Sequence, residues 1–314
     1  MTPGLTAFLF PGQGSQAVGM LDPWSLDAAG RASLTWAEGL LGVPLSRLMS
    51  VGPASVLDRS EVAQPALVAA GVLQAGRLRG MGLEPDLLIG HSVGGFAALV
   101  VAEALDFETA IRLARVHARL MTRAMPAEGG RMIAILGAER ESVAEACRAA
   151  RRHGVADVAC HNAPGHTVIS GARAAVEAAA DRLEGEGAMA VPLNIPLAAH
   201  CELLQPVVGE FARLVASCPV SPPRLPVLDN VSARPLMSAE DVRRSMVGQL
   251  TLPVLFEESV EAASGMGVVR YVECGPGESL SRCVRRQCPG VEAMACEQAI
   301  AGTTAAGGGA GRGA

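Results

Sequence analysis

Two kinds of apolar pattern alternate along the first hundred residues of this chain. Short, uninterrupted apolar runs of strand length occur at 5–10 and 87–89, and longer stretches with helical spacing occur at 27–41, 64–81 and 92–104. A buried parallel strand is apolar on both faces, whereas a covering helix is apolar along one stripe. The alternation therefore predicts an α/β protein with a parallel sheet covered on both faces.

The order of elements changes between residues 129 and 198. The pattern there predicts strands and helices in the order βαββαβ, at 131–136, 140–153, 155–161, 167–170, 172–183 and 189–195. This order is typical of the ferredoxin-like fold. We therefore expect a ferredoxin-like subdomain at 129–198, inserted into a larger, discontinuous domain formed by 1–128 and 199–298.

Beyond the insert, the pattern predicts a helix at 201–216, strands at 227–228 and 268–272, and a largely helical stretch at 239–264. The end of the chain, 299–314, consists mostly of alanine, glycine and threonine. Low-complexity sequence with few side chains to bury is typical of a disordered tail. We expect disorder over this last segment.

The composition excludes several classes of protein. All 26 basic side chains are arginine, so the chain has no lysine for a Schiff base, a pyridoxal phosphate anchor, a Walker-A loop or a protein kinase. A net charge of −5 and an aromatic content of 3% argue against nucleic acid as a partner.

The sequence also bears on the location of the protein. No apolar run is long enough to span a membrane, and residues 1–19 carry no basic side chain, so we expect neither membrane insertion nor secretion. The eight cysteines are scattered without a CxxC pair, which argues against a metal or redox site. Together these features favour a reduced, cytoplasmic protein.

The local pattern with the most specific chemistry is Gly-His-Ser-Val-Gly at 90–94, directly after an apolar run and before a helical stretch. In a nucleophile elbow, glycines permit a tight turn from which the serine hydroxyl projects, and N–H groups at the start of the next helix face the developing oxyanion. Ser92 is therefore the candidate nucleophile. The alternative interpretation is a glycine-rich turn whose serine caps the helix.

A serine nucleophile needs a base within hydrogen-bonding reach. Among the six histidines, His200 follows the end of the insert, where a cleft between insert and large domain would form. Its position favours His200 as the base, although a single histidine is more commonly structural.

Several motifs, in this order, resemble the malonyl-CoA:acyl carrier protein transacylase family. They are FLFPGQGSQAVGM at 8–20, GHSVGG at 90–95 and VECGPG at 272–277, with an insert that ends in a histidine. The chain also resembles polyketide synthase acyltransferase domains and the transacylase subunit of malonate decarboxylase. The resemblance implies an α/β-hydrolase-like large domain, a ferredoxin-like small one and an active site between them. Turns at 162–165 and 274–277 match glycine turns that we interpret as structural.

Carried over position by position, the resemblance implies that Ser92 and His200 form a Ser–His dyad. It also implies an oxyanion hole made by the N–H groups of Gln13 and Val93, and a backbone carbonyl of Gln249 that orients the histidine. The implied reaction is ping-pong transfer, in which Ser92 takes an acyl group from a thioester and passes it to the phosphopantetheine thiol of an acyl carrier protein. The donor is acyl-CoA or an acylated carrier protein, and no bound cofactor or metal is implied.

The chain departs from the family pattern where the acyl group is selected. Malonyl- and methylmalonyl-specific members carry an arginine at the position of His117, and imidazole cannot form the same two parallel bonds to a carboxylate. They usually have glutamate at Gly95, and Phe or Ser beside the base, where this chain has Leu197, Ala198 and Ala199. We therefore expect a stand-alone enzyme of polyketide or related biosynthesis that moves a non-carboxylated acyl group, aminoacyl and peptidyl groups included, between carrier proteins.

Other functions stay open on the sequence alone. The enzyme could be a malonyl-CoA:acyl carrier protein transacylase of fatty acid synthesis or malonate decarboxylase, or a hydrolase that clears acyl groups from carrier proteins. A plain α/β-hydrolase esterase would need a carboxylate as third triad member, for which Asp106, Asp157 and Asp181 are available. A non-catalytic scaffold is a further class, which an intact Ser92–His200 pair disfavours.

Carrier proteins are acidic, so arginines near the mouth of the cleft would steer them. The candidates are Arg151, Arg152, Arg282, Arg285 and Arg286. Each is equally open to interpretation as part of an ordinary solvated face.

Overall fold

The computed structural model describes residues 4–20, 26–126, 129–195 and 197–308. Its strands are β1 (Leu5–Phe10), β2 (Leu87–Gly90), β3 (Gly130–Leu136), β4 (Ala156–Ala163), β5 (His166–Ala172), β6 (Met189–Pro192), β7 (Val227–Leu228), β8 (Val254–Leu255), β9 (Val268–Glu273) and β10 (Glu292–Ala295). The longer helices are α1 (Ala28–Leu41), α4 (Ser60–Gly80), α6 (Phe107–Ala124), α7 (Arg140–Ala150), α8 (Arg173–Gly185), α9 (Gln205–Ser217), α10 (Ala239–Gly248), α11 (Phe256–Gly265) and α13 (Cys296–Gly308). The shorter ones are α2 (Leu45–Val51), α3 (Ala54–Leu57), α5 (Gly94–Val101) and α12 (Ser279–Gln287). This arrangement confirms the predicted α/β class.

The larger sheet has the strand order β10-β9-β1-β2-β7, and all of its strands are parallel. β1 and β2 are almost completely buried, as their uninterrupted apolar sequences predict. Helices α4 and α5 pack together, α5 contacts β1 and β2, and α11 and α12 contact β9. Because the strands are parallel, the loops after β1, β2, β7 and β9 all leave from the same edge of the sheet.

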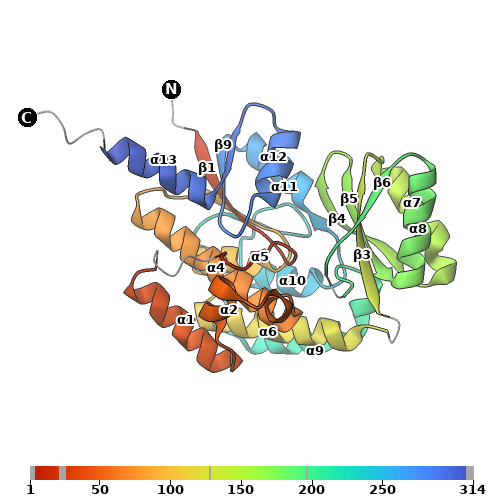
Figure 1. Cartoon of the computed structure of the whole chain (residues 1–314), viewed down its shortest axis with the longest axis horizontal. Coiled ribbons are helices and arrows are strands. Elements are labelled where there is room, and N and C mark those ends of the chain that lie inside the picture. Colours follow the sequence, from red (N-terminus) through yellow and green to blue (C-terminus); the bar gives the residue numbers. More distant parts are fainter. Residues whose placement is uncertain (1–3, 21–25, 127–128, 196, 309–314) are drawn as a thin grey trace, which may run out of the picture.

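The segment from β3 to β6 follows the predicted βαββαβ order and forms a second sheet, β6-β3-β5-β4-β8. Its first four strands pair antiparallel, and α7 and α8 pack on them over a separate apolar core that includes Ile133, Val143, Ile169 and Val176. In Figure 1 this unit lies beside the larger sheet, with α7 and α8 on its outer side. The insert therefore has a core of its own.

The fifth strand of the small sheet, β8, comes from outside the insert. β8 pairs parallel with β4 through Cys160↔Val254 and His161↔Leu255. The sequence pattern predicted only a helical stretch at 239–264, because a two-residue strand carries no recognisable periodicity. This strand ties the chain of the large domain to the insert.

Asp106 is the N-cap of helix α6, and its carboxylate accepts the N–H of Thr109 over 2.7 Å. Its buried face includes Ile111, Ala114 and His117, which recur at the spacing of one helix side. The helix therefore carries His117 into the interior beside α4.

The predicted disorder from residue 299 is wrong as far as Gly308, because α13 continues to that residue. Cys296 and Ala299 lie one turn apart and are both buried, and α13 contacts α4 and β9. Alanine-rich sequence has a high helix propensity, and this packing stabilises the helix. Residues 309–314 lie outside the described residues.

Among the described residues, no helix combines the length and the apolar character needed to cross a membrane.

Candidate active site

The loops after β1, β2 and β7 lie together at the edge of the larger sheet where these parallel strands end. Phe10 at the end of β1 pairs with Gly90 at the end of β2, so the turn that carries Gln13 lies beside the turn that carries Ser92. β7 lies on the other side of β2 and delivers Asn230 to the same place. A Cβ on Gly12 would lie 3.3 Å from the Cβ of Ser92, so the two turns are in direct contact.

Ser92 sits in a strained turn, as a nucleophile elbow requires. Its φ of 53° falls in the left-handed region, which a serine seldom adopts. The flanking glycines are sterically required: a Cβ on Gly90 would lie 2.3 Å from the Cα of Gly95, and one on Gly94 would lie 2.0 Å from the carbonyl oxygen of Phe10. The N–H of Ser92 donates to Oδ1 of Asn230 over 2.9 Å, which holds the strained residue from outside the motif.

Ser92 and His200 are in hydrogen-bonding contact, with 2.8 Å between Oγ and Nε2. Nδ1 of His200 lies 2.6 Å from the backbone carbonyl oxygen of Gln249. A carbonyl only accepts hydrogen bonds, so Nδ1 carries the ring proton and Nε2 is free to accept the proton of Ser92. The group beside Nδ1 is thus a carbonyl, and the structure brings together the three residues that the family resemblance implies.

Burial, with a smaller repulsion from His91, lowers the pKa of His200 to about 4. At neutral pH the ring is therefore uncharged, as a proton acceptor must be.

The pH at which the reaction rate falls on the acid side is expected to lie well below the ordinary pKa range of histidine. Acylation of Ser92 requires neutral His200, so its rate should hold as pH falls through 6.5 and decline only as pH approaches about 4. The measurement is kcat/KM for Ser92 acylation between pH 4 and 8. A half-maximal rate near pH 6.5 would contradict this expectation.

The stability of the fold is expected to change over the same pH range, so it must be measured beside the rate. Burial depresses the pKa of both His117 and His200 in the folded chain, so the unfolded chain binds protons first as pH falls below about 6.5. The free energy of unfolding is expected to decrease from there toward pH 4. Circular dichroism at each pH separates this loss of structure from titration of the base.

Two backbone N–H groups belong to residues in the turns beside the Ser92 side chain. Val93 is the N-cap of α5, and Gln13 lies in the adjoining turn after β1. In the part of the chain that the structure describes, neither N–H has an acceptor. Such free donors suit a developing oxyanion.

A cavity of about 450 Å³ opens over Ser92 and His200, between the two sheets. Its walls are mainly apolar and include Met121, Met132 and Leu193. Among the described lining residues, Asp58 is the only one with a carboxyl group and none is an arginine. The cavity can therefore hold an acyl chain without offering a fixed positive charge.

His117 lies behind this cavity and does not form part of its described lining. Its ring is 1% exposed and packs edge-on against Phe96 and Phe211, with centroid distances of 6.0 and 5.3 Å. Burial, and then the neighbouring His200, lower the pKa of His117 to about 3. His117 is thus a neutral ring at pH 7 and cannot act as a cationic carboxylate clamp.

Of the other predicted specificity residues, two line the cavity and two do not. Leu197 and Ala199 line the cavity. Ala198 is buried behind them, with its N–H 3.2 Å from the sulfur of Met125, and Gly95 lies against Asn230 in a separate, smaller cavity. A Cβ on Gly95 would approach the Asn230 side-chain nitrogen to 2.6 Å, so a glutamate there would displace Asn230.

The two glycine turns support the cavity walls. Asn162 accepts a hydrogen bond at Oδ1 from Nε2 of His91 over 2.8 Å, which links the insert to the elbow. At the other turn, a Cβ on Gly275 would lie 2.3 Å from Pro11, so the turn packs against the chain that leads to Gln13.

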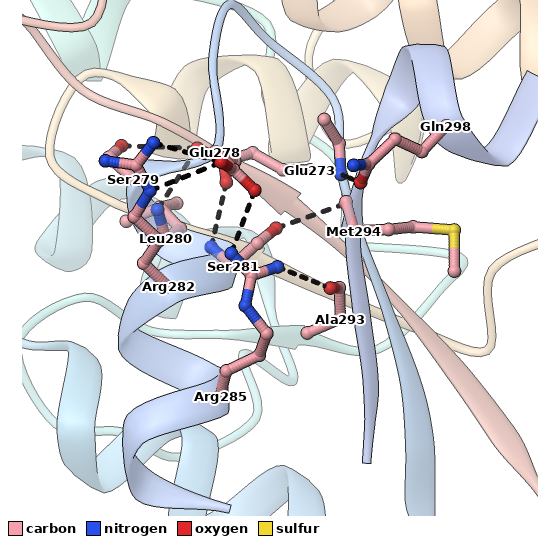
Figure 2. Close-up of polar contacts among 11 residues, drawn as sticks. Glu273, Glu278, Ser279, Leu280, Ser281, Arg282, Arg285, Ala293, Met294 and Gln298 are labelled. Carbon is pink, nitrogen blue, oxygen red and sulfur yellow. Dashed lines mark hydrogen bonds and ion pairs between the residues drawn. The ribbon is translucent and has the colours of Figure 1, made fainter.

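The buried carboxylate of Glu273, at the end of β9, fixes the start of α12. It accepts hydrogen bonds from the N–H groups of Leu280 and Ser281 and from the Ser279 hydroxyl (Figure 2). Ser279 and Leu280 line the cavity, so this buried contact at the helix start holds one of its walls.

Most of the predicted docking arginines already have acidic partners. Arg151 pairs with Asp157 and Glu202, and Glu278 pairs with both Arg282 and Arg285 (Figure 2). Arg152 hydrogen-bonds to the neighbouring His153 ring. Arg286 lies beside Gly165 and His166, and no ion pair joins it to the described acidic residues. The guanidinium of Arg286 therefore lies near a residue of the cavity lining, His166.

Sequence reasoning missed Asn230 and Gln64. Asn230 follows a two-residue strand and belongs to no local motif, and only its contact with the Ser92 N–H reveals its role. Gln64 was included in a predicted helix as an ordinary position, although a glutamine in the apolar stretch of α4 was a visible signal of a buried polar contact.

Comparison with known proteins gives matches over most of the chain. A family described as the acyl transferase domain matches residues 7–306. The malonyl CoA-acyl carrier protein transacylase of Haemophilus influenzae is 36% identical over 284 residues, which cover 89% of this chain and 91% of that one. A polyketide biosynthesis malonyl CoA-acyl carrier protein transacylase of Bacillus subtilis is 34% identical over 293 residues, covering 92% and 99%.

Solved structures give the same result. The malonyl-CoA:acyl carrier protein transacylase of Xanthomonas oryzae superposes with a TM-score of 0.92 and 37% identity, covering 98% of this chain and 99% of that one. A malonyl-transacylase in complex with a type II polyketide synthase acyl-carrier protein gives a TM-score of 0.88 and 35% identity, covering 93% and 94%. These matches confirm the resemblance inferred from the motifs.

Proposed function

The chain belongs to the acyl transferase domain family, and we propose that it transfers an acyl group to an acyl carrier protein through an acyl-serine intermediate on Ser92. The observation that carries this proposal is the Ser92–His200 contact of 2.8 Å beside two free backbone N–H groups. His200 removes the hydroxyl proton as Ser92 attacks the thioester carbon, and the thiolate leaves with that proton. The N–H groups of Gln13 and Val93 hold the oxyanion. The thiol of a carrier protein then gives its proton to His200 and attacks the acyl-serine, and the Ser92 oxygen leaves with that proton.

The architecture supports the same proposal. An elbow directly after β2 of a parallel sheet is the arrangement of an α/β-hydrolase-like domain. The order β6-β3-β5-β4 of the insert, with its helices on one face, supports a ferredoxin-like subdomain.

We propose that the transferred acyl group lacks a free carboxylate. The lining of the cavity supports this, because its described residues include the Asp58 carboxyl and no arginine. Arg115 and Arg119, the nearest arginines on α6, do not supply the missing charge, because Arg115 donates to the Leu40 carbonyl and Arg119 pairs with Glu61. An uncharged or amino-bearing acyl group, such as an aminoacyl or peptidyl group, suits such a site.

Malonyl transfer is the second candidate, and the relatives favour it. Several proteins that match over most of this chain are named as malonyl-CoA:acyl carrier protein transacylases. The two candidates differ in one property that can be measured, the charge of the acyl group that loads onto Ser92.

Replacing His117 by arginine should raise the ratio of the malonyl loading rate to the butyryl loading rate about 10- to 100-fold, because a guanidinium forms charge-assisted bonds to the carboxylate. The measurement is the intact mass of the enzyme over time with malonyl-CoA and, separately, with butyryl-CoA. Butyryl loading is the control and should not increase. Rapid formation of a malonyl adduct on the unaltered enzyme at micromolar substrate would overturn the non-carboxylated assignment and leave the acyltransferase assignment intact.

The esterase alternative loses support in the structure. An esterase triad needs a carboxylate on His200, but Nδ1 faces the Gln249 carbonyl, Asp157 accepts from Arg151, and Asp106 caps α6. Hydrolysis in place of transfer would be recognised by release of free acid when no carrier protein is present.

The carrier protein is expected to approach along α12. Arg286 lies there beside His166 of the cavity lining, where a positive charge can meet an acidic partner. Arg151, Arg152, Arg282 and Arg285 are exposed and can add to the field around this mouth.

A further inference from the structure

A chain of side-chain hydrogen bonds joins His117 to the turn at Gln13. Nδ1 of His117 lies 2.9 Å from Oε1 of Gln64, Nε2 of Gln64 donates to Oε1 of Gln13 over 3.1 Å, and Nε2 of Gln13 donates to Oγ of Ser60 over 2.8 Å. His117, Gln64 and Ser60 are each at most 5% exposed. His117 and Ser60 lie outside the described lining of the cavity, whereas Gln64 and Gln13 belong to it, so the two buried end groups orient the two amides between them.

The direction of these bonds fixes the protonation of the histidine. Gln64 turns its NH₂ group toward Gln13 and leaves its oxygen for His117. An amide oxygen only accepts, so Nδ1 of His117 carries the proton and donates it. The His117 ring is therefore a fixed hydrogen-bond donor at the end of this series of hydrogen bonds.

Gln13 needs an anchor of this kind because its backbone has little intrinsic rigidity. Glycines flank it on both sides, and Gly14 has a φ of 104° that other residues rarely adopt. Both polar atoms of its side-chain amide are held, Oε1 by Gln64 and Nε2 by Ser60. A change in that grip would move the Gln13 N–H relative to Ser92.

We infer that His117 is a positioning residue, which holds the Gln13 N–H in place for the oxyanion through Gln64. The inference rests on the proposed acyl-serine chemistry, in which that N–H stabilises the tetrahedral intermediate. The other ring nitrogen, Nε2, is buried and has no partner among the described residues, so only the Nδ1 side of the ring is engaged.

The test uses 4-nitrophenyl acetate, whose small acyl group acylates serine whatever the natural substrate is. His117→Leu should lower the acylation rate constant about 10- to 100-fold with little change in KM, because a displaced donor weakens transition-state stabilisation more than substrate binding. His117→Asn places an amide N–H near the position of Nδ1 and should recover most of the rate. His117→Gln places its amide near Nε2 and should stay slow.

Gln64→Met removes the central link and should be as slow as His117→Leu, and the double variant should be no slower than either. Arg112→Ala, on the exposed side of α6, is the control and should retain the full rate. Thermal melting of each variant identifies any that fails to fold. If His117→Leu does not fold, Gln64→Met and the pair of His117→Asn and His117→Gln carry the test.

Two outcomes overturn the inference, and they are distinguishable. If the unaltered enzyme gives no nitrophenol burst above that of Ser92→Ala, the proposed function is wrong and the inference falls with it. If the burst is normal but His117→Asn is no faster than His117→Gln, the positioning role alone is wrong.

Discussion

Replacing Ser92 with alanine is expected to abolish the acyl-enzyme and to lower the rate of acyl transfer by about 10⁴-fold or more. In the proposed mechanism the hydroxyl oxygen bonds to the acyl carbon, and its hydrogen-bonded neighbour, His200, is aligned to take its proton. The measurements are the intact mass after incubation with an acyl thioester and the steady-state rate of transfer to a carrier protein.

His200→Ala should have an effect of similar size, and the double variant should be little worse, because nucleophile and base act as one unit. Ser217→Ala, at the exposed end of α9, is the matched control and should load normally. An acyl adduct that persists in Ser92→Ala would place the nucleophile elsewhere and contradict the proposed mechanism.

The largest effect on stability is expected for Gly94→Ala. The added Cβ would lie 2.0 Å from the carbonyl oxygen of Phe10 and 2.8 Å from that of Pro11, and both contacts are with backbone that cannot rotate away. Either the elbow must shift away from β1 or α5 must move, at a cost of about 3 kcal/mol in the free energy of unfolding. Denaturant titration measures this cost.

Gly76→Ala is the control for Gly94→Ala. Gly76 lies in α4, is exposed, and has open space where a Cβ would be. Alanine there should leave stability unchanged or raise it by about 0.5–1 kcal/mol, because glycine is a poor helix former. Equal stability of the two variants would show that the elbow tolerates a side chain at Gly94.

Much of the fold and the turn that carries Ser92 could be predicted because both are encoded locally. β1 and β2 are continuous apolar runs, and Ser92 is marked by the glycines that its turn requires. His200 was recognisable only as a residue at the end of the insert, until the family motifs gave it a role. The carbonyl of Gln249 could come only from resemblance, because any residue has such a group.

The acyl-selecting region shows where local reasoning fails. His117 was expected to line the pocket, yet its ring lies behind the lining and hydrogen-bonds to Gln64. Gly95 was grouped with it, yet it packs against Asn230. Both corrections depend on contacts across more than 50 positions of sequence, which no periodicity or spacing can specify.

The short strand β8 has a consequence for any exchange of parts between relatives. It lies next to Asn230 through the bond from the Leu255 N–H to the Asn230 carbonyl, and it follows closely after Gln249, which orients His200. An insert transferred between relatives as residues 129–198 alone would lack β8, the edge strand of its sheet, and would be separated from Gln249, whose carbonyl contacts His200. A working chimera should therefore carry the stretch from Gln249 to Leu255 along with the insert, since the two halves of this enzyme do not separate at the ends of the inserted sequence.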